Sequence, residues 1–225
     1  METNWTAIVP MKLESERVPG KNYRLLGDKP LFYYVISTLL ETGVFEDIII
    51  DIDDLKLKHE LLKEFPRGLT ILERSPELRG NYVSMNEIIL GRLKDVKTEF
   101  VLQTHVTSPF LKRGTISSAI ECFLNNVVKK EANDSLFSVT DSYKRYYFKE
   151  KPVNHDGRML TTQFLHPIQE ENSLFYLFSK SNFLTNQNRI GHQPIFYKTD
   201  EFEAWDIDTE FDFIIAQKLI TNVSI

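Results

Sequence analysis

The sequence predicts an α/β fold, a mostly parallel sheet covered by helices on both faces, and two observations support this. Over the first 140 residues, short apolar runs of strand length alternate with segments that have a helical spacing of apolar residues. Runs such as DIIIDI at 47–52 are apolar at nearly every position, which is typical of parallel strands buried on both faces. A chain of 225 residues with 42% hydrophobic and 26% charged residues fits one globular domain that needs no disulfide or metal to hold its core.

The expected elements follow one another in order, and local signals mark several of their ends. Strands are expected at residues 5–10, 47–52, 68–72, 99–104, 135–140, 174–178 and 193–198. Helices are expected at 29–42, 55–65, 84 to about 96, 115–128 and 209–220. Pro30 in the first turn and Gly43 after the last residue bound the first helix. The capping-box sequences SMNE at 84–87 and TEFD at 209–212 open the third and the last helix.

The composition excludes several classes of protein. A formal net charge of -5 argues against non-specific binding to nucleic acid or to anionic membranes. No run approaches about 18 apolar residues, and the N-terminus lacks a basic segment followed by an apolar one. We therefore expect neither a spanning helix nor a secretory signal, and a cytoplasmic protein. The single cysteine, Cys122, excludes an intrachain disulfide framework and a cysteine-rich zinc site.

The alternation of strands and helices breaks after Thr140, where residues 141–169 are rich in aromatic and basic side chains. The sequence NHDG at 154–157 predicts a turn, so we interpret this stretch as a β-hairpin arm inserted into a single domain spanning 1–225. Four aromatic residues lie within six positions: Tyr143, Tyr146, Tyr147 and Phe148. The stretch is either a plain surface hairpin or a dimerisation arm, since exposed aromatic side chains on a protruding hairpin need a partner.

Ligands of open α/β sheets bind beyond the carboxyl ends of the strands, and the loop after the first strand, residues 11–24, is basic. Four cations minus two carboxylates give it a local charge of +2: Lys12, Arg17, Lys21 and Arg24 against Glu14 and Glu16. The loop matches neither the dinucleotide-binding glycine fingerprint nor the Walker A sequence. Arginine and lysine at such a place suit a polyphosphate, because they direct donors at phosphate oxygens. The alternative is a solvated surface loop.

A strongly acidic segment lies near the C-terminus, with seven carboxylates and no basic residue between 200 and 212. If this segment is extended, Asp206 and Asp208 point the same way while Ile207 packs inward. Two such carboxylates suit Mg²⁺, which completes its shell with water and phosphate oxygens. The alternative is that Asp208 caps the following helix. With a basic phosphate loop in the same chain, the two interpretations carry comparable weight.

Two further loops hold candidate groups. Arg74, just after the third strand, can reach a base or a phosphate, or it can be a surface ion-pair partner. The sequence QTHVTSP at 103–109 gathers donors and acceptors that suit sugar hydroxyls, and it begins with Gln103 and Thr104. His105 is either a general base or a hydrogen-bonded structural residue. The five histidines show no metal-ligand spacing, and no serine lies in a G-x-S-x-G setting.

Several segments, in order along the chain, resemble a known family. The sequence AIVPMKLESERVPGKN at 7–22 resembles the N-terminal signature of the CMP-sialic acid synthetases, or acylneuraminate cytidylyltransferases, which is usually I-P-A-R-G-G-S-K-R-I-P-x-K-N. The similarity continues through KPLFYYVISTLLETGVFEDIII, ERSPEL, LQTHVTSPF and DIDTEFDF. The resemblance implies a Rossmann-like nucleotidyltransferase fold, similar to the glycosyltransferase-A fold, and a homodimer. It also implies Mg²⁺-dependent transfer of CMP from CTP to the anomeric hydroxyl of a sialic-acid-like keto-sugar acid, a nonulosonate, with release of pyrophosphate.

The resemblance also implies a role for each matching position. Arg17 and Lys21 are expected to be catalytic, Lys12, Asn22, Arg74 and Ser84 to bind the nucleotide, Gln103, Thr104 and Gln163 to contact the sugar, and Asp206 and Asp208 to bind Mg²⁺. The arm is expected to pack on the partner subunit and to help close its sugar site. Catalysis is then mostly electrostatic, with the basic loop and Mg²⁺ stabilising charge on the phosphates.

The sequence departs from the usual pattern in the first loop and in the arm. The residues at 13–14 are Leu-Glu where the family has Gly-Gly, Glu16 replaces lysine and Lys12 replaces arginine, as in a divergent branch. In the arm, relatives often have Arg-x-Gln where this chain has TTQ at 161–163, so the sugar stays open and Arg158 is a possible substitute. Two alternatives remain: a nucleotidyltransferase for another acidic sugar or another nucleotide, and a catalytically weak nucleotide-binding relative with a regulatory role.

Overall fold

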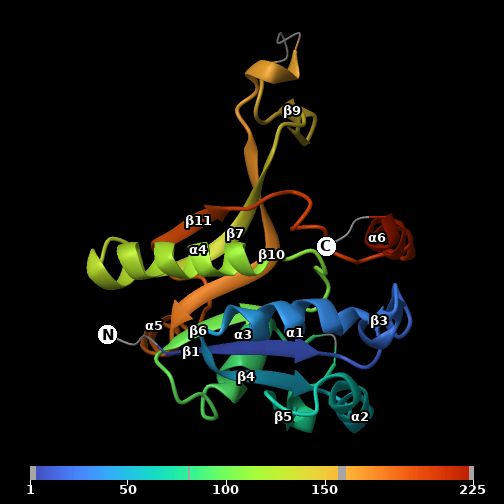
Figure 1. Ribbon diagram of the computed structural model, residues 1–225. Helices are drawn as coiled ribbons and strands as arrows, with labels where there is room; N and C mark the ends of the chain where they lie inside the picture. The colour runs from blue at the N-terminus through green and yellow to red at the C-terminus, as the bar shows by residue number, and fades with distance from the viewer. Residues whose placement is uncertain (1–3, 81, 157–160, 223–225) are drawn as a thin grey trace.

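The centre of the molecule is a seven-stranded sheet, shown in Figure 1 by a computed structural model that describes residues 4–80, 82–156 and 161–222. The strands are β1 (Trp5–Met11), β4 (Phe45–Ile52), β5 (Thr70–Glu73), β6 (Phe100–Thr104), β7 (Ser135–Ser142), β10 (Ile168–Ser179) and β11 (Pro194–Lys198). Their spatial order is β11-β7-β10-β6-β1-β4-β5, and every neighbouring pair is parallel except the two that involve β10. The prediction of a mostly parallel sheet is confirmed.

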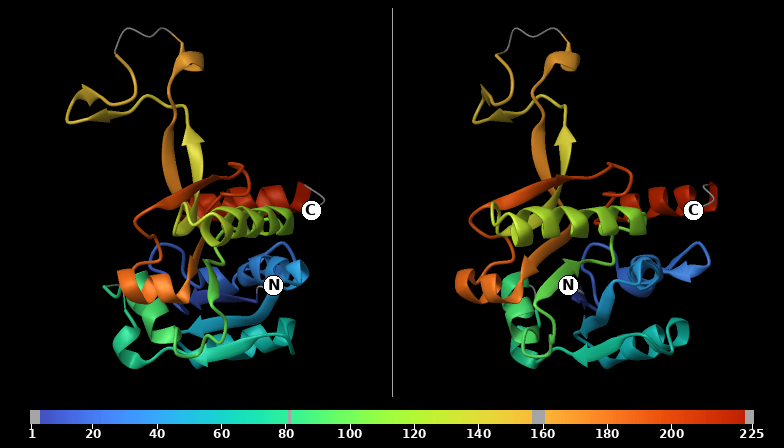
Figure 2. Two further views of the ribbon diagram at one scale, coloured as in Figure 1. Left: turned by 90° about the vertical axis from the view of Figure 1, so that its left-hand side faces the viewer. Right: turned by 60° about the vertical axis from the view of Figure 1, so that its left-hand side comes forward.

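Helices cover both faces of this sheet (Figure 2). The six α-helices of the described residues are α1 (Leu31–Thr42), α2 (Leu55–Glu64), α3 (Met85–Arg92), α4 (Arg113–Phe123), α5 (Lys180–Asn186) and α6 (Glu210–Asn222). Side chains alternate along the strands: Ala7 and Val9 pack with α1, α2 and α4, whereas Ile8 between them packs with α3 and α5. Helix α6 packs on the first loop and the start of α1. None of the described helices is long and apolar enough to cross a membrane.

Short elements complete the chain. They are the 3-10 turns η1 (Lys21–Tyr23), η2 (Pro76–Leu78) and η4 (Thr162–Phe164), the π-helical turn η3 (Leu124–Lys129), and the two-stranded ribbons β2 (Leu25–Leu26) with β3 (Lys29–Pro30) and β8 (Tyr147–Phe148) with β9 (Lys151–Pro152). The ribbon of β2 and β3 explains why α1 begins at Leu31 rather than at residue 29, since Lys29 and Pro30 pair with β2.

The predicted elements agree with the structure, apart from their ends and one helix. The capping box at Ser84 and Glu87 is present and opens α3, but this helix stops at Arg92 rather than near 96. At that point the Arg92 guanidinium turns inward to bond the neighbouring strands. Thr209 and Asp212 form the second expected capping box. Helix α5 was not expected from the sequence, because its seven residues show little apolar periodicity.

The chain between β7 and β10 projects from the sheet as an arm (Figure 2). The two strands pair out to Ser142 and Ile168, and the β8–β9 ribbon lies beyond them. The predicted turn at 154–157 does not join the two strands of this ribbon: the chain reverses at Lys149 and Glu150, whose φ angles are +47° and +65°. Asn154 is used differently, because its side chain accepts from the Tyr146 amide at 3.0 Å and donates to the backbone of the arm. Residue 157 lies outside the described residues.

Candidate functional site

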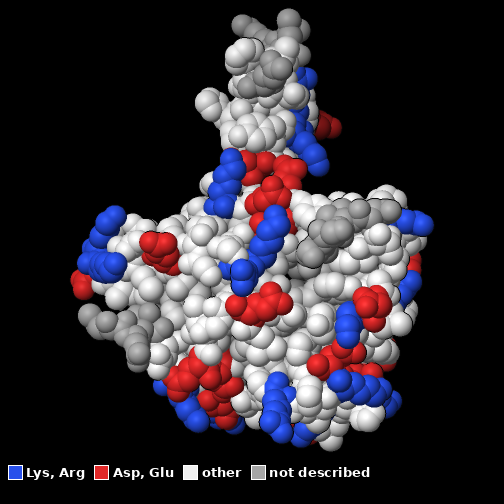
Figure 3. Space-filling view, in the orientation of Figure 1, with Lys and Arg blue, Asp and Glu red and all other residues white. Residues whose placement is uncertain are grey.

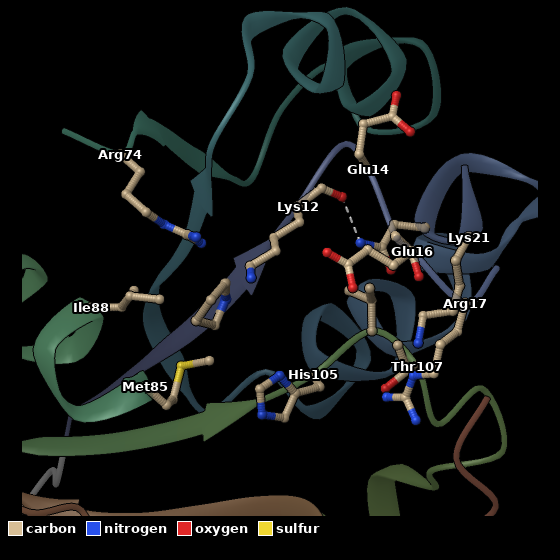
Figure 4. A pocket seen from close by; sticks show the side chains of 14 residues that line it. Lys12, Glu14, Glu16, Arg17, Lys21, Arg74, Met85, Ile88, His105 and Thr107 are labelled. Carbon is tan, nitrogen blue, oxygen red and sulfur yellow. Dashed lines mark hydrogen bonds between the residues drawn. The ribbon is translucent and has the colours of Figure 1, made fainter. Parts of the chain in front are cut away.

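Loops from three parts of the chain meet beyond the carboxyl ends of β1 and β6 and enclose a cavity of about 350 Å³, the first cavity (Figure 4). Five of the residues expected at the site line it: Lys12, Arg17, Lys21, Asn22 and Arg74. Figure 4 shows Arg74 with the apolar side chains Met85 and Ile88 on one side, Arg17 and Lys21 on the other, and Lys12 between them. The cavity therefore has an arginine beside apolar side chains at one end and two cations at the other.

The first loop is held in a closed shape by its own side chains. Asn22 Nδ2 donates to the Lys12 carbonyl at 2.7 Å, and the Leu13 amide donates to Asp53 Oδ1, also at 2.7 Å, which ties the loop to the end of β4. Gly20 has a φ of +65°, and a Cβ there would lie 2.9 Å from the Tyr23 ring, so this turn requires glycine. Asn22 Oδ1 is buried and finds no hydrogen-bond partner within residues 4–80, 82–156 and 161–222.

Arg74 is buried in an ion cluster beneath the first cavity. Its Nε donates to Asp51 Oδ2 at 2.6 Å, and the other oxygen of Asp51 accepts from Arg92 Nε at 2.7 Å. Only 1% of Arg74 and none of Asp51 is exposed, so the interpretation of Arg74 as a surface ion-pair partner is wrong. Arg74 Nη1 is buried but has no partner among the described residues. An unpaired buried donor in a residue that lines a cavity indicates a place for a ligand acceptor.

The acidic segment meets the basic loop at a second, smaller cavity of about 270 Å³, the linking cavity. Asp206 and Asp208 both line this cavity, while Ile207 between them is fully buried. Arg17 Nη2 donates to Asp208 Oδ1 at 2.8 Å, and Lys21 Nζ lies 3.6 Å from the same oxygen. Thr209, not Asp208, caps α6. Arg17 and Asp208 are 191 positions apart in the sequence, so the fold brings the basic and acidic segments together at one place.

Asp206 is the more buried of the two carboxylates. Burial raises its pKa, a hydrogen bond from Thr107 opposes this effect, and the charge of Asp208 adds to it. In the part of the chain that the structure describes, Asp206 Oδ1 has no hydrogen-bond partner. Asp206 is therefore a carboxylate whose negative charge is poorly compensated by its surroundings, which is how an unfilled cation ligand is expected to look.

The predicted sugar-contacting residues of β6 lie behind this cleft. Thr104 is fully buried and its hydroxyl donates to the Leu174 carbonyl at 2.7 Å, so it fastens β6 to β10. Gln103 Nε2 lies 3.2 Å from His105 Nε2, and Gln103 Oε1 accepts from Arg189 Nη1 at 2.5 Å. Burial, with the nearby charges of Arg189 and Lys21, lowers the pKa of His105 to about 4. A neutral imidazole engaged by Gln103 suits a hydrogen-bonded structural residue better than a general base.

Of the remaining expected site residues, Ser84 does not line the first cavity, and Gln163 has a side chain outside the described residues. Ser84 is exposed, its hydroxyl bonds Glu87 Oε2 at 2.6 Å as part of the capping box, and it does not line the first cavity. The next residue, Met85, does line the first cavity. The side chain of Gln163 and the whole of Arg158 lie outside the described residues, so their expected roles stay predictions.

Sequence reasoning missed three charged residues that shape the site. Asp51 is an acid between isoleucines in β4, a signal that pointed to a buried charge needing a partner. Arg92 and Arg189 carry no such signal, because a helix end and a polar loop are ordinary places for arginine. Their role depends on which strands they fold against.

The sheet is mostly parallel, and beyond the carboxyl ends of its strands Arg17 and Lys21 face the carboxylates Asp206 and Asp208. This arrangement of cations for phosphate and carboxylates for a metal indicates a protein of the nucleotidyltransferase class. A family model described as cytidylyltransferase matches residues 6–218, and the chain belongs to this family.

Curated relatives and a solved structure agree with this assignment. The chain is 29% identical over 218 residues to an N-acylneuraminate cytidylyltransferase of Streptococcus agalactiae, which covers 92% of this chain and 51% of that protein. It is 25% identical to a CMP-N,N'-diacetyllegionaminic acid synthase of Legionella pneumophila, with 95% of both chains covered. A solved CMP:2-keto-3-deoxy-manno-octonic acid synthetase in complex with CTP has the same fold, with a TM-score of 0.71, 11% identity, and 97% and 98% of the two chains covered. The chain thus spans about half the length of the first of these relatives and nearly all of the second. The predicted resemblance to the CMP-sialic acid synthetase family is confirmed.

Proposed function

We propose that this chain transfers CMP from CTP to the anomeric hydroxyl of a sialic-acid-like keto-sugar acid and releases pyrophosphate. One observation carries the proposal. Among the described residues, five buried side-chain polar atoms have no hydrogen-bond partner, and three of them belong to residues that line the two connected cavities: Asn22 Oδ1, Arg74 Nη1 and Asp206 Oδ1. Unpaired buried polar atoms are rare in folded proteins, and their grouping in one cleft supports a polar ligand with donors, acceptors and positive charge.

The two ends of the first cavity suit different parts of the nucleotide, the base at one end and the phosphates at the other. Arg74 Nη1 is a donor beside the apolar Met85 and Ile88, which suits the carbonyl and flat face of a pyrimidine. Arg17 and Lys21, at the other end, suit the phosphates. In the reaction, the anomeric hydroxyl loses its proton to water and its oxygen forms a bond to the α-phosphorus of CTP, while the bond from that phosphorus to the bridging oxygen breaks and pyrophosphate leaves. Arg17 and Lys21 then stabilise the charge on the departing pyrophosphate.

The pair of carboxylates fits a divalent cation, for which we propose Mg²⁺. Among the described residues Asp206 Oδ1 is unpaired and suits a hard positive ion. Asp208 Oδ1 is held by Arg17 at 2.8 Å, so it would have to exchange this ion pair for the metal. The described residues contain no group of three or more His, Cys, Asp or Glu able to hold a metal, so most of the shell would be water and phosphate oxygens. When bound, Mg²⁺ neutralises charge on the phosphates.

A second candidate is a relative that binds nucleotide but transfers CMP slowly. Glu14 and Glu16 favour it, because both exposed carboxylates line the cavity in which the phosphates are proposed to bind. Release of pyrophosphate from four nucleoside triphosphates, each with a panel of 2-keto sugar acids, separates the two. Turnover with CTP and a sugar acid supports the enzyme, whereas CTP binding with no turnover on any sugar supports the weak relative.

CTP with Mg²⁺ is expected to raise the melting temperature more than ATP, GTP or UTP at equal concentration. A ligand at about a hundred times its dissociation constant stabilises the native state by about 2.7 kcal/mol, which corresponds to about 5–10 °C for a chain of this size. Differential scanning fluorimetry measures the shift, and Arg74→Gln is expected to reduce the preference for CTP. A uniform shift for all four nucleotides would indicate recognition of the phosphates alone.

The arm and the cavity at its base support a homodimer, which we propose. We also propose that residues 1–225 form a single cytidylyltransferase domain with 141–169 as its insertion. Tyr147 and Phe148, near the outer end of the arm, are 62% and 66% exposed. At its base lies a cavity of about 710 Å³, the basal cavity, lined by seven carboxylates and one cation, Lys144. Figure 3 shows acidic side chains gathered where the arm leaves the body. Exposed aromatic side chains on the arm and an acidic cavity at its base favour pairing of two copies.

Replacement of residues 143–164 by a short Gly-Ser linker is expected to convert the dimer to a monomer. The shortened protein should still bind CTP, since none of the residues that line the first cavity is removed, but should lose turnover of the sugar. Light scattering and the fluorimetry above measure the two effects, with Leu62→Ser as an exposed apolar control far along the chain from the arm. A wild-type monomer, or a monomeric variant with unimpaired turnover, contradicts the proposed role of the arm.

A further inference from the structure

Arg189, in the segment between α5 and β11, is a cation held against the sheet by three elements. Its guanidinium carbon lies 3.6 Å from the centroid of the Tyr176 ring on β10. Its Nη1 donates to Gln103 Oε1 of β6 at 2.5 Å, and its backbone amide donates to Asn86 Oδ1 of α3 at 3.2 Å. A long flexible side chain stacked and bonded in this way has lost most of its rotamer freedom, so its charge has a fixed position.

This fixed charge lacks an anionic partner among the described residues. Arg189 takes part in none of the ion pairs found there, and its one side-chain hydrogen bond goes to a neutral amide. Glu171 is the carboxylate whose charge acts on it, but Glu171 Oε1 accepts a hydrogen bond from the Tyr176 hydroxyl. Burial lowers the pKa of Arg189, which is the sign of a cation poorly compensated by its surroundings. A guanidinium offers five N–H donors, so most of its capacity is left for a ligand.

The surroundings of Arg189 connect it to the cleft on two sides. Gln103, its acceptor, contacts His105, which lines both the first cavity and the linking cavity. Tyr176, on which it stacks, has its hydroxyl 3.0 Å from Ser173 Oγ, and Ser173 lines the linking cavity and the basal cavity. Arg189 lines none of these three cavities itself, but its side chain is partly exposed, and its contacts connect it to residues that line the cleft.

The charges on that side of the cleft explain why a cation is needed at the position of Arg189. The basal cavity carries seven carboxylates against one lysine, so an anionic substrate that enters there is repelled. The cations of the first loop are already needed for the triphosphate. A carboxylate on the second substrate needs another cation, and a planar guanidinium is suited to bind it with two parallel donors.

We propose that Arg189 determines the specificity of the enzyme for an acidic sugar by binding the carboxylate of the second substrate next to Gln103 and Tyr176. The proposal rests on the proposed cytidylyltransferase function and adds a residue to its sugar side. Arg189 is a specificity residue that need not touch the reacting phosphate. Its loss therefore changes the KM for the sugar acid and leaves nucleotide binding unchanged.

The test compares a sugar acid with its uncharged ester in the full-length protein. Pyrophosphate release is measured with CTP and either N-acetylneuraminate or N,N'-diacetyllegionaminate, and with the methyl ester of the same sugar. Arg189→Gln keeps a donor for Gln103 and removes the charge, Arg189→Lys keeps the charge and loses the planar fork, and Arg113→Gln is an exposed control of the same type. We expect Arg189→Gln to raise the KM of the acid about tenfold or more and to lose most of the preference for acid over ester. Arg189→Lys should keep part of that preference, and Arg113→Gln all of it.

The outcomes separate the two proposals. If the wild type turns over the acid and Arg189→Gln keeps the same ratio of acid to ester, the role of Arg189 is wrong while the proposed function stands. If the wild type releases no pyrophosphate with any sugar acid, the proposed function is wrong, and the inference falls with it. An unchanged CTP-induced rise in melting temperature confirms that the variant is folded. A loss of that rise in Arg189→Gln contradicts a role confined to the sugar.

Discussion

Asp206→Asn and Asp208→Asn are each expected to lower metal-dependent CMP transfer at least about a hundredfold without unfolding the protein. Each change removes an anionic oxygen from a site at which two carboxylates face the basic loop. For Asp206 the expected effect on stability is opposite in sign to the effect on activity. Because burial raises its pKa, the folded state binds the proton more tightly than the unfolded state, and stability is lost as pH rises through the folded pKa. An uncharged amide at 206 should therefore leave the melting temperature at neutral pH unchanged or higher.

Steady-state rates across a magnesium titration, with melting curves on the same samples, measure both effects. Asp200→Asn is the matched control, since Asp200 lies in the same acidic segment but outside the three cavities of the cleft. Wild-type rates in both variants would show that Asp206 and Asp208 do not bind the catalytic metal. A large drop in melting temperature for Asp206→Asn would contradict the inference that the buried charge of Asp206 lowers the stability of the folded protein.

Asp51→Ala is expected to destabilise the protein by about 3–5 kcal/mol, because it leaves two buried guanidinium groups without their shared carboxylate. Arg74 and Arg92 both bond Asp51 through Nε, at 2.6 Å and 2.7 Å, and the cluster is nearly closed to solvent. Denaturant unfolding measures the change, and Glu46→Ala, an exposed acid on the same strand, should stay within about 0.5 kcal/mol of the wild type. At temperatures where the variant is folded, its KM for CTP should rise as well, since Asp51 orients Arg74 toward the first cavity. A stability loss below about 1 kcal/mol would mean that water compensates the two arginines.

The parts of this structure that were predictable are those in which the nearest residues in sequence decide the outcome. The run at 47–52 became a doubly buried strand, and the capping boxes at Ser84 and Thr209 formed as their spacing required. The convergence of the first loop with Asp208 was also foreseeable, since parallel strands bring their carboxyl ends to one edge.

The rest depended on contacts between distant elements. The sequence left Arg74 open between a ligand contact and a surface ion pair, because nothing next to it in sequence shows that Asp51 of another strand lies beneath it. Arg189 reaches Gln103 from 86 positions away. The turn of the arm was misplaced because Asn154, a typical turn residue, instead bonds the backbone at Lys144 and Tyr146. In each case a polar side chain had several possible partners, and tertiary packing selected one of them.

The reversed direction of β10 has a consequence for how this protein can change. Because β7 ends, and β10 begins, at the edge of the sheet where the parallel strands β1 and β6 end, everything inserted between them emerges beside the cleft. None of the described residues from 143 to 164 belongs to the buried hydrophobic core, so the length and sequence of this stretch are free of the packing demands on the sheet. Mutations there can alter what approaches the basal cavity without changing the buried core or the residues that line the first cavity. The fold thus separates the part of the chain that must be preserved from a part in which the preference for the proposed sugar substrate can change.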